Sequence, residues 1–310
     1  MFVVDKTNLK SFDVIDYIFS KTRLRDKQTN LKTVVSINGE YSTRNYTVFD
    51  LQNLKGKKQL SKTLPFTSEE ALAAEAAGID ALNVRYNPER PELAVSIRQA
   101  APQTFMTFAM PMQAATTTSE ALSVCFDAME CGADSIMCGT WSLDFIEAAA
   151  KAGIPVEGHI GLVPRKSTWT GGLKAVGKTK DQTVNLYSQI RSLENAGAWA
   201  VEVEVVPHNI TDILAQNTEL VVTSIGSGKA DFQFLFAQDI LGDGNHFPRH
   251  SKQYADFKKI RDELQTQRVD AFKHYISDVN SGLFPTEENL VHAANEVQEF
   301  MEKLTGGEDG

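Results

Sequence analysis

The feature that most constrains this sequence is one junction that occurs four times. An alanine-rich amphipathic segment ends at a glycine and is followed at once by a short apolar run, at Gly78, Gly132, Gly153 and Gly197. Glycine just past a helix adopts the left-handed conformation without a Cβ clash, so each junction predicts a helix, its C-terminal cap and then a strand. Nearly wholly apolar runs are typical of parallel strands that are covered on both faces.

Eight strand candidates alternate with helix signals along the chain. This number and spacing predict an α/β fold, the (β/α)8 barrel. A doubly wound open sheet is the alternative, but no G-x-G-x-x-G follows the first strand to seat a dinucleotide. The candidates lie near 60–65, 80–86, 105–110, 134–139, 155–160, 199–205, 220–225 and 232–237, and a further strand-like run lies at 33–37.

Segments at both ends lie outside this pattern. Residues 1–46 are expected to be an extension, and the barrel with its C-terminal helices is expected to cover 47–304. Long helices are predicted up to Gly282, with a last helix starting at Pro285 and Thr286. The tail, 305–310, should fray.

Composition bounds the class of protein. The chain has 310 residues, 42% hydrophobic and 23% charged, which is typical of a globular protein. No apolar run of about 18 residues is present and the N-terminus does not resemble a secretory signal, so a cytoplasmic, unprocessed protein is expected, with no membrane partner. Cys125, Cys131 and Cys138 lack paired CxxC spacing, which favours reduced thiols over a zinc or redox site.

Charge is unevenly distributed. The net charge is −9, yet residues 1–64 carry 12 Lys and Arg against 6 Asp and Glu. Such a segment could guide a nucleic acid or an acidic partner, or it could pack on an acidic neighbour. No aromatic and basic motif supports nucleic-acid binding, so no nucleic acid is expected as a partner.

The stretch "PVEGHIGLVP" from Pro155 to Pro164 places a histidine between two glycines in an apolar run. Glycine permits close backbone approach and Pro164 should end the strand, so the run predicts a strand that turns tightly at the barrel mouth. Catalytic residues of such barrels lie at the C-terminal ends of the strands. His159 is therefore expected to face the central cavity.

The same stretch, together with "CGADSI", "LENAGAWAVEVEVVP", "SIGSG" and "DVNSGLFPTEEN" in this order, resembles the ketopantoate hydroxymethyltransferase family over about residues 47–292. The resemblance implies a barrel of the phosphoenolpyruvate/pyruvate type, often assembled as a homo-oligomer. It also implies transfer of a one-carbon unit from methylenetetrahydrofolate to 3-methyl-2-oxobutanoate. In that reaction Mg²⁺ chelates the 2-oxo acid and a glutamate removes the adjacent C–H proton.

Three acidic positions of the family motifs are replaced in this sequence. The aspartates of strands two and three become Tyr86 and Ala109, and the strand-four lysine and glutamate become Met137 and Gly139. Magnesium prefers oxygen ligands that usually include carboxylates. We therefore expect no metal site here, and no cofactor is assigned with certainty.

The proton-handling residues are retained. The resemblance aligns Glu204 with the proposed base, and Glu202 lies on the same side of the strand. Burial in a barrel should raise the pKa of such a carboxyl toward the range of a useful base. The structural alternatives are that His159 only hydrogen-bonds at the mouth and that Glu204 only pairs with Arg85 or Arg165.

Two hypotheses follow. In the first, the chain is a metal-independent enzyme that binds a 2-oxo acid or related carboxylate. Glu204, His159 and Tyr86 are its candidate catalytic residues, and Arg85, Asn87 and Arg165 are its candidate substrate-binding residues, because a guanidinium binds a carboxylate bidentately. In the second, the chain is catalytically silent and acts as a partner or regulatory subunit through its basic extension.

Overall fold

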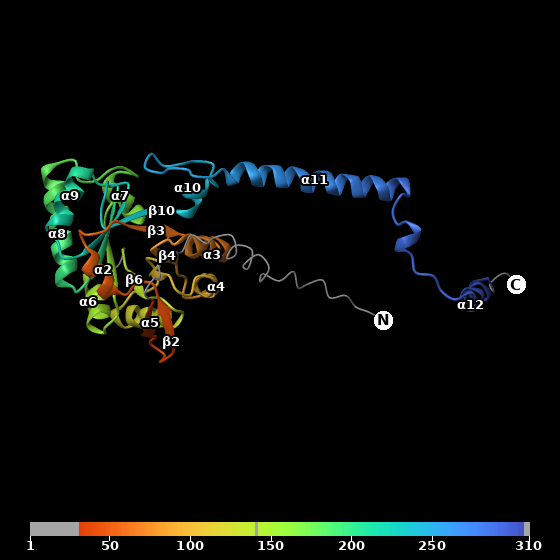
Figure 1. Ribbon diagram of the computed structural model, residues 1–310, viewed down its shortest axis with the longest axis horizontal. Coiled ribbons are helices and arrows are strands. Elements are labelled where there is room, and N and C mark those ends of the chain that lie inside the picture. The colour runs from red at the N-terminus through yellow and green to blue at the C-terminus, as the bar shows by residue number, and fades with distance from the viewer. Residues whose placement is uncertain (1–30, 140–141, 307–310) are drawn as a thin grey trace. The chain divides into compact units, whose positions relative to one another are not determined.

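The computed structural model describes residues 31–139 and 142–306 (Figure 1). The chain divides into two compact units, one that ends at Ala255 and one that begins at Asp256. The first contains the barrel and the second contains the C-terminal helices. The sequence predicted that the barrel and the C-terminal helices form one segment, 47–304. This stays a prediction, because the structure separates the two units after Ala255.

The first unit is a closed barrel of eight strands, in the spatial order β10-β3-β4-β5-β6-β7-β8-β9 (Figure 1). All of these pairings are parallel, and β10 pairs with β3 to close the sheet. The predicted (β/α)8 barrel is therefore confirmed and the open sheet is excluded. The strands are β3 (Leu60–Leu64), β4 (Ala81–Arg85), β5 (Phe105–Ala109), β6 (Ser135–Met137), β7 (Val156–Gly161), β8 (Ala200–Glu204), β9 (Val221–Ile225) and β10 (Phe232–Phe236).

Helices follow the strands and begin and end largely as the sequence predicts. The Thr117 side chain accepts from the amide of Glu120, and the Glu120 carboxylate accepts from that of Thr117, which completes a capping box. Gly78 caps its helix with φ 86°, a conformation that favours glycine. The helices are α2 (Val48–Leu54), α3 (Ser68–Ala77), α4 (Glu92–Ala100), α5 (Thr118–Glu130), α6 (Leu143–Lys151), η1 (Pro164–Lys166), α7 (Ser167–Thr170), α8 (Lys180–Asn195), α9 (His208–Gln216) and α10 (Ala237–Leu241).

Alternate residues of each strand face the barrel interior and form layers. The layer farthest from the mouth is apolar and includes Leu60, Phe105 and Phe232. Above it lies a buried ion pair between Lys62 and Glu157. Because parallel strands end together at one edge, the residues that follow these layers gather at the C-terminal mouth.

The part of the N-terminal extension that the structure describes is a hairpin of β1 (Lys32–Val35) and β2 (Tyr41–Arg44). The Nε of Arg44 lies 2.7 Å from Asp134, and Arg98 lies 2.7 Å from the other oxygen of the same carboxylate. Asp134 thereby ties the hairpin to the barrel. The predicted strand at 33–37 is present, one residue earlier at its start, whereas the rest of the basic extension lies outside the described residues.

The second unit consists of α11 (Phe257–Ser281), η2 (Glu287–Asn289) and α12 (Asn295–Thr305). Gly282 caps α11 as predicted. The predicted start of the last helix is wrong, because Thr286 caps only the short turn η2 and α12 begins at Asn295. Most of the tail predicted to fray, 307–310, lies outside the described residues. No helix in the described part of the chain is long and apolar enough to cross a membrane.

Candidate active site at the barrel mouth

A cavity of about 680 Å³ lies at the C-terminal ends of the strands. Side chains from β4, β7 and β8 line it together with the loops that follow β4, β5 and β7. This is where barrel enzymes place their chemistry, and its volume suits a small-molecule ligand.

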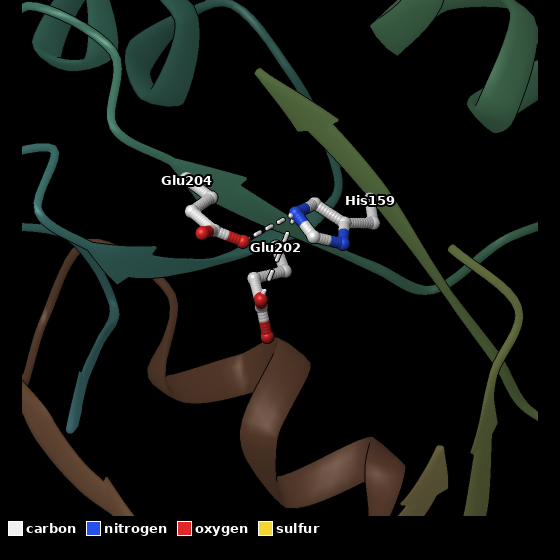
Figure 2. Close-up of side chains that lie close together, drawn as sticks. All are labelled: His159, Glu202 and Glu204. Carbon is white, nitrogen blue, oxygen red and sulfur yellow. Dashed lines mark ion pairs between the residues drawn. The ribbon is translucent and has the colours of Figure 1, made fainter. Parts of the chain in front are cut away.

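His159, Glu202 and Glu204 meet on one wall of this cavity (Figure 2). His159 of β7 lies directly across from Glu202 of β8 in the strand register, and Glu204 follows two residues later on the same face. The Nε2 atom of His159 is 3.1 Å from Oε2 of Glu204 and 3.8 Å from Oε1 of Glu202. The predicted meeting of His159 and Glu204 at the mouth is what the structure shows.

The absence of a side chain at Gly139 makes room for this histidine. A Cβ atom added at Gly139 would lie 2.6 Å from the Cβ and 3.0 Å from the Nδ1 of His159. Contacts that short do not occur, so any larger residue at position 139 would force His159 to move. The replacement at the end of β6 and the position of the imidazole on β7 are therefore linked.

A buried ion pair lies below the three residues. The Nζ of Lys62 donates to both oxygens of Glu157, at 2.9 and 2.7 Å, and Thr223 Oγ1 donates to Oε1 of Glu157 at 2.8 Å. Glu157 is two residues before His159 on the inward face of β7. Since Lys62 neutralises Glu157, the carboxylates nearer the mouth lack a lysine partner of their own in the described structure.

Several buried polar atoms in this region have no hydrogen-bond partner among the described residues: His159 Nε2, Glu202 Oε2, Asn83 Oδ1 and Thr107 Oγ1. The His159 and Glu204 contact is thus an ion pair without well-formed hydrogen-bond geometry. Unsatisfied buried polar groups cost free energy and are uncommon in folded proteins. Their concentration beside a cavity is typical of a site that binds a polar ligand.

Two of these residues, Glu202 and His159, have raised pKa values. The pKa of Glu202 is raised to about 7, chiefly by burial and also by the nearby Glu157 and Glu204, and against the lowering effect of His159 and Lys62. For His159, burial alone would lower the pKa, but Glu202, Glu204 and Glu157 outweigh it and the pKa is raised. A carboxyl with a pKa near neutral pH beside an imidazole with a raised pKa suits acid and base chemistry.

The three predicted substrate-binding residues line the same cavity, Arg85 and Asn87 at the end of β4 and Arg165 in the loop after β7. The guanidinium of Arg85 lies 4.9 Å from the centre of the Phe66 ring. Arg85 and Arg165 form no ion pair in the described structure and are exposed. The alternative in which Glu204 pairs with one of these arginines is wrong, because its charged partner is His159.

Tyr86 is not placed to act as predicted. Its ring stacks on Phe108, and its hydroxyl lies 3.9 Å from the Sγ of Cys131, just after α5. Successive strand residues face opposite sides, so when Arg85 faces the interior Tyr86 faces the helices. Burial and the neighbouring Cys131 raise the pKa of its phenol. It borders the cavity but turns its hydroxyl away.

The positions that correspond to the family's metal-associated acids offer no suitable ligands. Ala109 and Gly139 have no side-chain ligand atoms, and the hydroxyl of Tyr86 lies against Cys131. His159, Glu202 and Glu204 could instead hold an ion, since one ligand atom from each lies within 4.8 Å of the others. A histidine with two carboxylates suits a transition metal better than magnesium.

Sequence reasoning did not assign Lys62, Glu157 or Asn83, and it treated Glu202 only as a neighbour of the base. Glu157 could have been found, because it stands two residues before His159 and must share its face of the strand. Lys62 and Asn83 gave no signal, since an isolated polar residue in a strand does not reveal its partner on another strand.

A closed parallel barrel with ionisable side chains gathered at its C-terminal mouth defines the class of (β/α)8 barrel enzymes. Residues 88–287 match the family described as ketopantoate hydroxymethyltransferase. A 3-methyl-2-oxobutanoate hydroxymethyltransferase from Kosmotoga olearia is 32% identical over 77% of this chain and 94% of its own length. The enzyme of that name from Thermus thermophilus is 29% identical over 78% of this chain and 98% of its own. The chain belongs to the ketopantoate hydroxymethyltransferase family, as its sequence motifs indicated.

Solved structures with a similar arrangement are more distant in sequence. A putative phosphonomutase from Burkholderia cenocepacia has a TM-score of 0.48 and 13% identity, over 76% of this chain and 98% of that one. A phosphonopyruvate hydrolase in complex with oxalate and Mg²⁺ has a TM-score of 0.46 and 11% identity, over 85% of this chain and 96% of that one.

Proposed function

We propose that this protein is an enzyme that removes a proton from the carbon next to the carbonyl of a 2-oxo acid or related carboxylate, in the course of C–C bond or one-carbon transfer chemistry. The observation that carries this proposal is the contact between His159 and Glu204, 3.1 Å apart on the wall of the cavity. The family to which the chain belongs supports the substrate class and the hydroxymethyl transfer.

Glu204 is the base in this proposal. Its side chain is 16% exposed, whereas that of Glu202 is 5% exposed, so Glu204 is the carboxylate that a substrate in the cavity reaches first. The C–H proton passes to the Glu204 carboxylate and the electron pair moves toward the carbonyl oxygen. Protonated His159 then donates a hydrogen bond to the developing enolate oxygen. Glu202 lies behind both and supplies or accepts a proton.

Arg85 binds the substrate carboxylate from the opposite side of the cavity. Its guanidinium has no carboxylate partner in the described structure and is held over the Phe66 ring, so it is free to form a bidentate pair. Asn87 and Arg165, which line the same cavity, are the further candidates for binding the polar end of a substrate. Tyr86 is left out, since its hydroxyl is engaged elsewhere.

We propose that the family's magnesium position is not used here. The support is the lack of side-chain ligand atoms at Ala109 and Gly139 and the clash that any side chain at 139 would create. A second candidate is favoured by the unpartnered Glu202 Oε2, namely that His159, Glu202 and Glu204 together hold a transition metal. Metal analysis of the protein purified without chelator separates the two, since the proton-based site predicts less than 0.1 ion per chain.

We also infer a homo-oligomer in the cytoplasm. Within the C-terminal unit taken by itself, apolar side chains are exposed along α11, among them Ile260, Phe272 and Ile276, and apolar surface of this extent is typical of interfaces. The three cysteines are free thiols, which suits a reducing compartment. Light scattering after size exclusion tests the assembly, and a monomer would contradict it.

Deuterium wash-in tests the proposed reaction. Wild-type protein is incubated with 2-oxo acids in D₂O and exchange next to the carbonyl is followed by NMR. We expect Glu204→Gln to lose at least about 100-fold in exchange rate, since general-base catalysis contributes that much. Glu130→Gln, an exposed carboxylate on α5, is the matched control. Equal exchange in wild type and Glu204→Gln would overturn the proposal, and no exchange with any acid would favour the silent-partner hypothesis.

A further inference from the structure

A second cavity, of about 690 Å³, lies beside the active site and has no role in the proposed reaction. The loops after β7, β8 and β9 line it, together with the segment after α10. In (β/α)8 barrels, the loops that follow the seventh and eighth strands frequently form an anion-binding site. In this barrel the seventh and eighth strands are β9 and β10. The second cavity lies beside the loop after β9, which is the position of an anion-binding site in many such barrels.

The lining of this cavity is basic. Lys178, Lys229 and Arg249 carry the fixed positive charges, and His208 and His250 add two imidazoles. No aspartate or glutamate is among the described residues that line it. The three fixed cations have no carboxylate partner in the described structure. Of the imidazoles, His208 lies 3.7 Å from Asp212 and His250 interacts with Asp239. A concave surface with uncompensated cations attracts anions.

The loop "SIGSG" forms part of the wall. Gly226 and Gly228 have φ of 66° and 87°. A Cβ atom at Gly228 would lie 2.5 Å from the Cβ of His208, and one at Gly226 would lie 3.0 Å from the Nδ1 of His250. The two glycines thus allow both imidazoles to pack directly on the loop. The amides of residues 226–228 have no acceptor in the described structure, and successive free amides in such a loop favour an anion.

The helix that begins at this cavity adds to the same field. α9 starts at His208, is 9 residues long, and has no side-chain hydrogen bond at its N-cap, Pro207. The N-terminal end of a helix carries a partial positive charge. Three features therefore favour an anion in the second cavity: the fixed cations, the free amides of the loop and the N-terminal end of α9.

Val205 connects this cavity to the active site. Glu204 lines the first cavity, whereas Val205, the next residue, lines the second. Val205 has φ 49°, the one positive value for a residue other than glycine in the described part of the chain. Such a conformation is strained for a β-branched residue and persists only where its surroundings hold it. Its amide donates to Ile225 and its carbonyl accepts from Val176, which fixes the turn between the two cavities.

We propose that this second cavity is a binding site for an anionic ligand that carries a phosphate or a cluster of carboxylates. Lys178, Lys229 and Arg249 bind the charged group, and the amides of the glycine loop orient it. Because Val205 directly follows the base of the first cavity, a ligand in the second cavity fixes the end of β8 on which Glu204 lies.

Calorimetric titration of the full chain at low salt tests the proposal, with pyrophosphate and citrate as probes for the two kinds of anion. We expect wild type to bind at least one of them with 1:1 stoichiometry. The double variant Lys229→Gln/Arg249→Gln should weaken that binding at least tenfold. Lys151→Gln, an exposed lysine on α6, is the matched control and should bind as wild type does. Stronger binding of pyrophosphate would identify a phosphate ligand, and stronger binding of citrate a polycarboxylate.

Two results would overturn the proposal: no binding of either probe by wild type, or equal binding by the double variant. A separate readout is the NMR signals of the His208 and His250 rings, which should shift on titration. Glu204→Gln should retain full anion binding, since it lies outside the second cavity. The proposal therefore stands or fails independently of the proton-transfer reaction.

Discussion

The two sides of the barrel mouth differ in how they handle charge. On the β7 and β8 side, His159, Glu202 and Glu204 form a cluster with raised pKa values at His159 and Glu202. On the β4 to β6 side, the strands end in Arg85, Ala109 and Met137, and the cation Arg85 is next to Tyr86, which corresponds to the first acidic position of the family motifs. In the proposed reaction, the first side transfers the proton and the second binds the substrate carboxylate directly. The comparison teaches that charge at one side of such a mouth can differ from the family pattern while the acidic residues and the histidine at the other side are kept.

The largest effect is expected from removing the proton donor on the β7 and β8 side. His159→Asn should lower kcat for deuterium exchange about 100- to 1,000-fold, because the enolate oxygen loses a charged hydrogen-bond donor. KM should change less than threefold. His274→Asn on α11 serves as the control. A kcat within a factor of three of wild type would assign His159 a structural role only.

The variant Arg85→Met tests substrate binding on the β4 to β6 side of the mouth. We expect KM for the carboxylate substrate to rise about 10- to 100-fold, since a hydrogen bond to a charged group contributes about 1.5–3 kcal/mol. The kcat should stay within threefold, the reverse of the His159 variant. Arg90→Met changes a nearby exposed arginine and should have no effect. An unchanged KM for Arg85→Met would exclude Arg85 as the carboxylate site.

The raised pKa of Glu202 predicts a pH-dependent stability. Between its ordinary value of 4.5 and about 7, the unfolded chain releases this proton and the folded chain keeps it, so the free energy of unfolding falls as pH rises. The raised pKa of His159 acts in the same direction at higher pH. Glu202→Gln should therefore be more stable than wild type at pH 8, by on the order of 2 kcal/mol, and should differ least at pH 5.

Thermal unfolding from pH 5 to pH 8 measures this difference. Glu299→Gln, an exposed carboxylate on α12, should follow wild type throughout. A Glu202→Gln curve that runs parallel to wild type across the whole range would show that Glu202 does not take up a proton in this window.

A pair of glycine variants compares the cavity with the helix layer. Gly139→Ala and Gly158→Ala both place a Cβ 2.6 Å from a neighbour, His159 in the first case and Leu193 in the second. Gly139→Ala should lower kcat about tenfold by displacing His159, because small misplacements of a catalytic group are costly. Gly158→Ala should lower the melting temperature but leave kcat within twofold. Equal kcat losses in both would indicate a general loss of structure.

The smallest effect is expected from metal removal. Dialysis against EDTA and addition of Mg²⁺ should each change turnover less than twofold, because Tyr86, Ala109 and Gly139 offer no carboxylate at the positions of the family's metal-associated acids. Strong magnesium dependence would show that a metal binds on the β4 to β6 side after all. Activation by Zn²⁺ or Mn²⁺ alone would instead favour the His159, Glu202 and Glu204 cluster as its ligands.

Local signals were sufficient to predict the barrel. Caps such as Thr117 and Gly78 act within a few residues of the chain, so the sequence displays them directly. The site was predictable where it depended on strand alternation, as for Glu202 and Glu204 on β8. Tyr86 was assigned incorrectly because it was considered beside Arg85 without that alternation. The pairing of Lys62 with Glu157, 95 residues apart, depends on barrel closure, which no local pattern encodes.

The space that His159 takes over the end of β6 has a consequence for how this protein can change. Because a Cβ at position 139 would collide with the imidazole, an acidic side chain cannot be accommodated there by a single substitution while His159 stays in place. A second substitution that moves or shortens the side chain at 159 would have to come first. The order in which these two positions can be changed by mutation is thereby restricted.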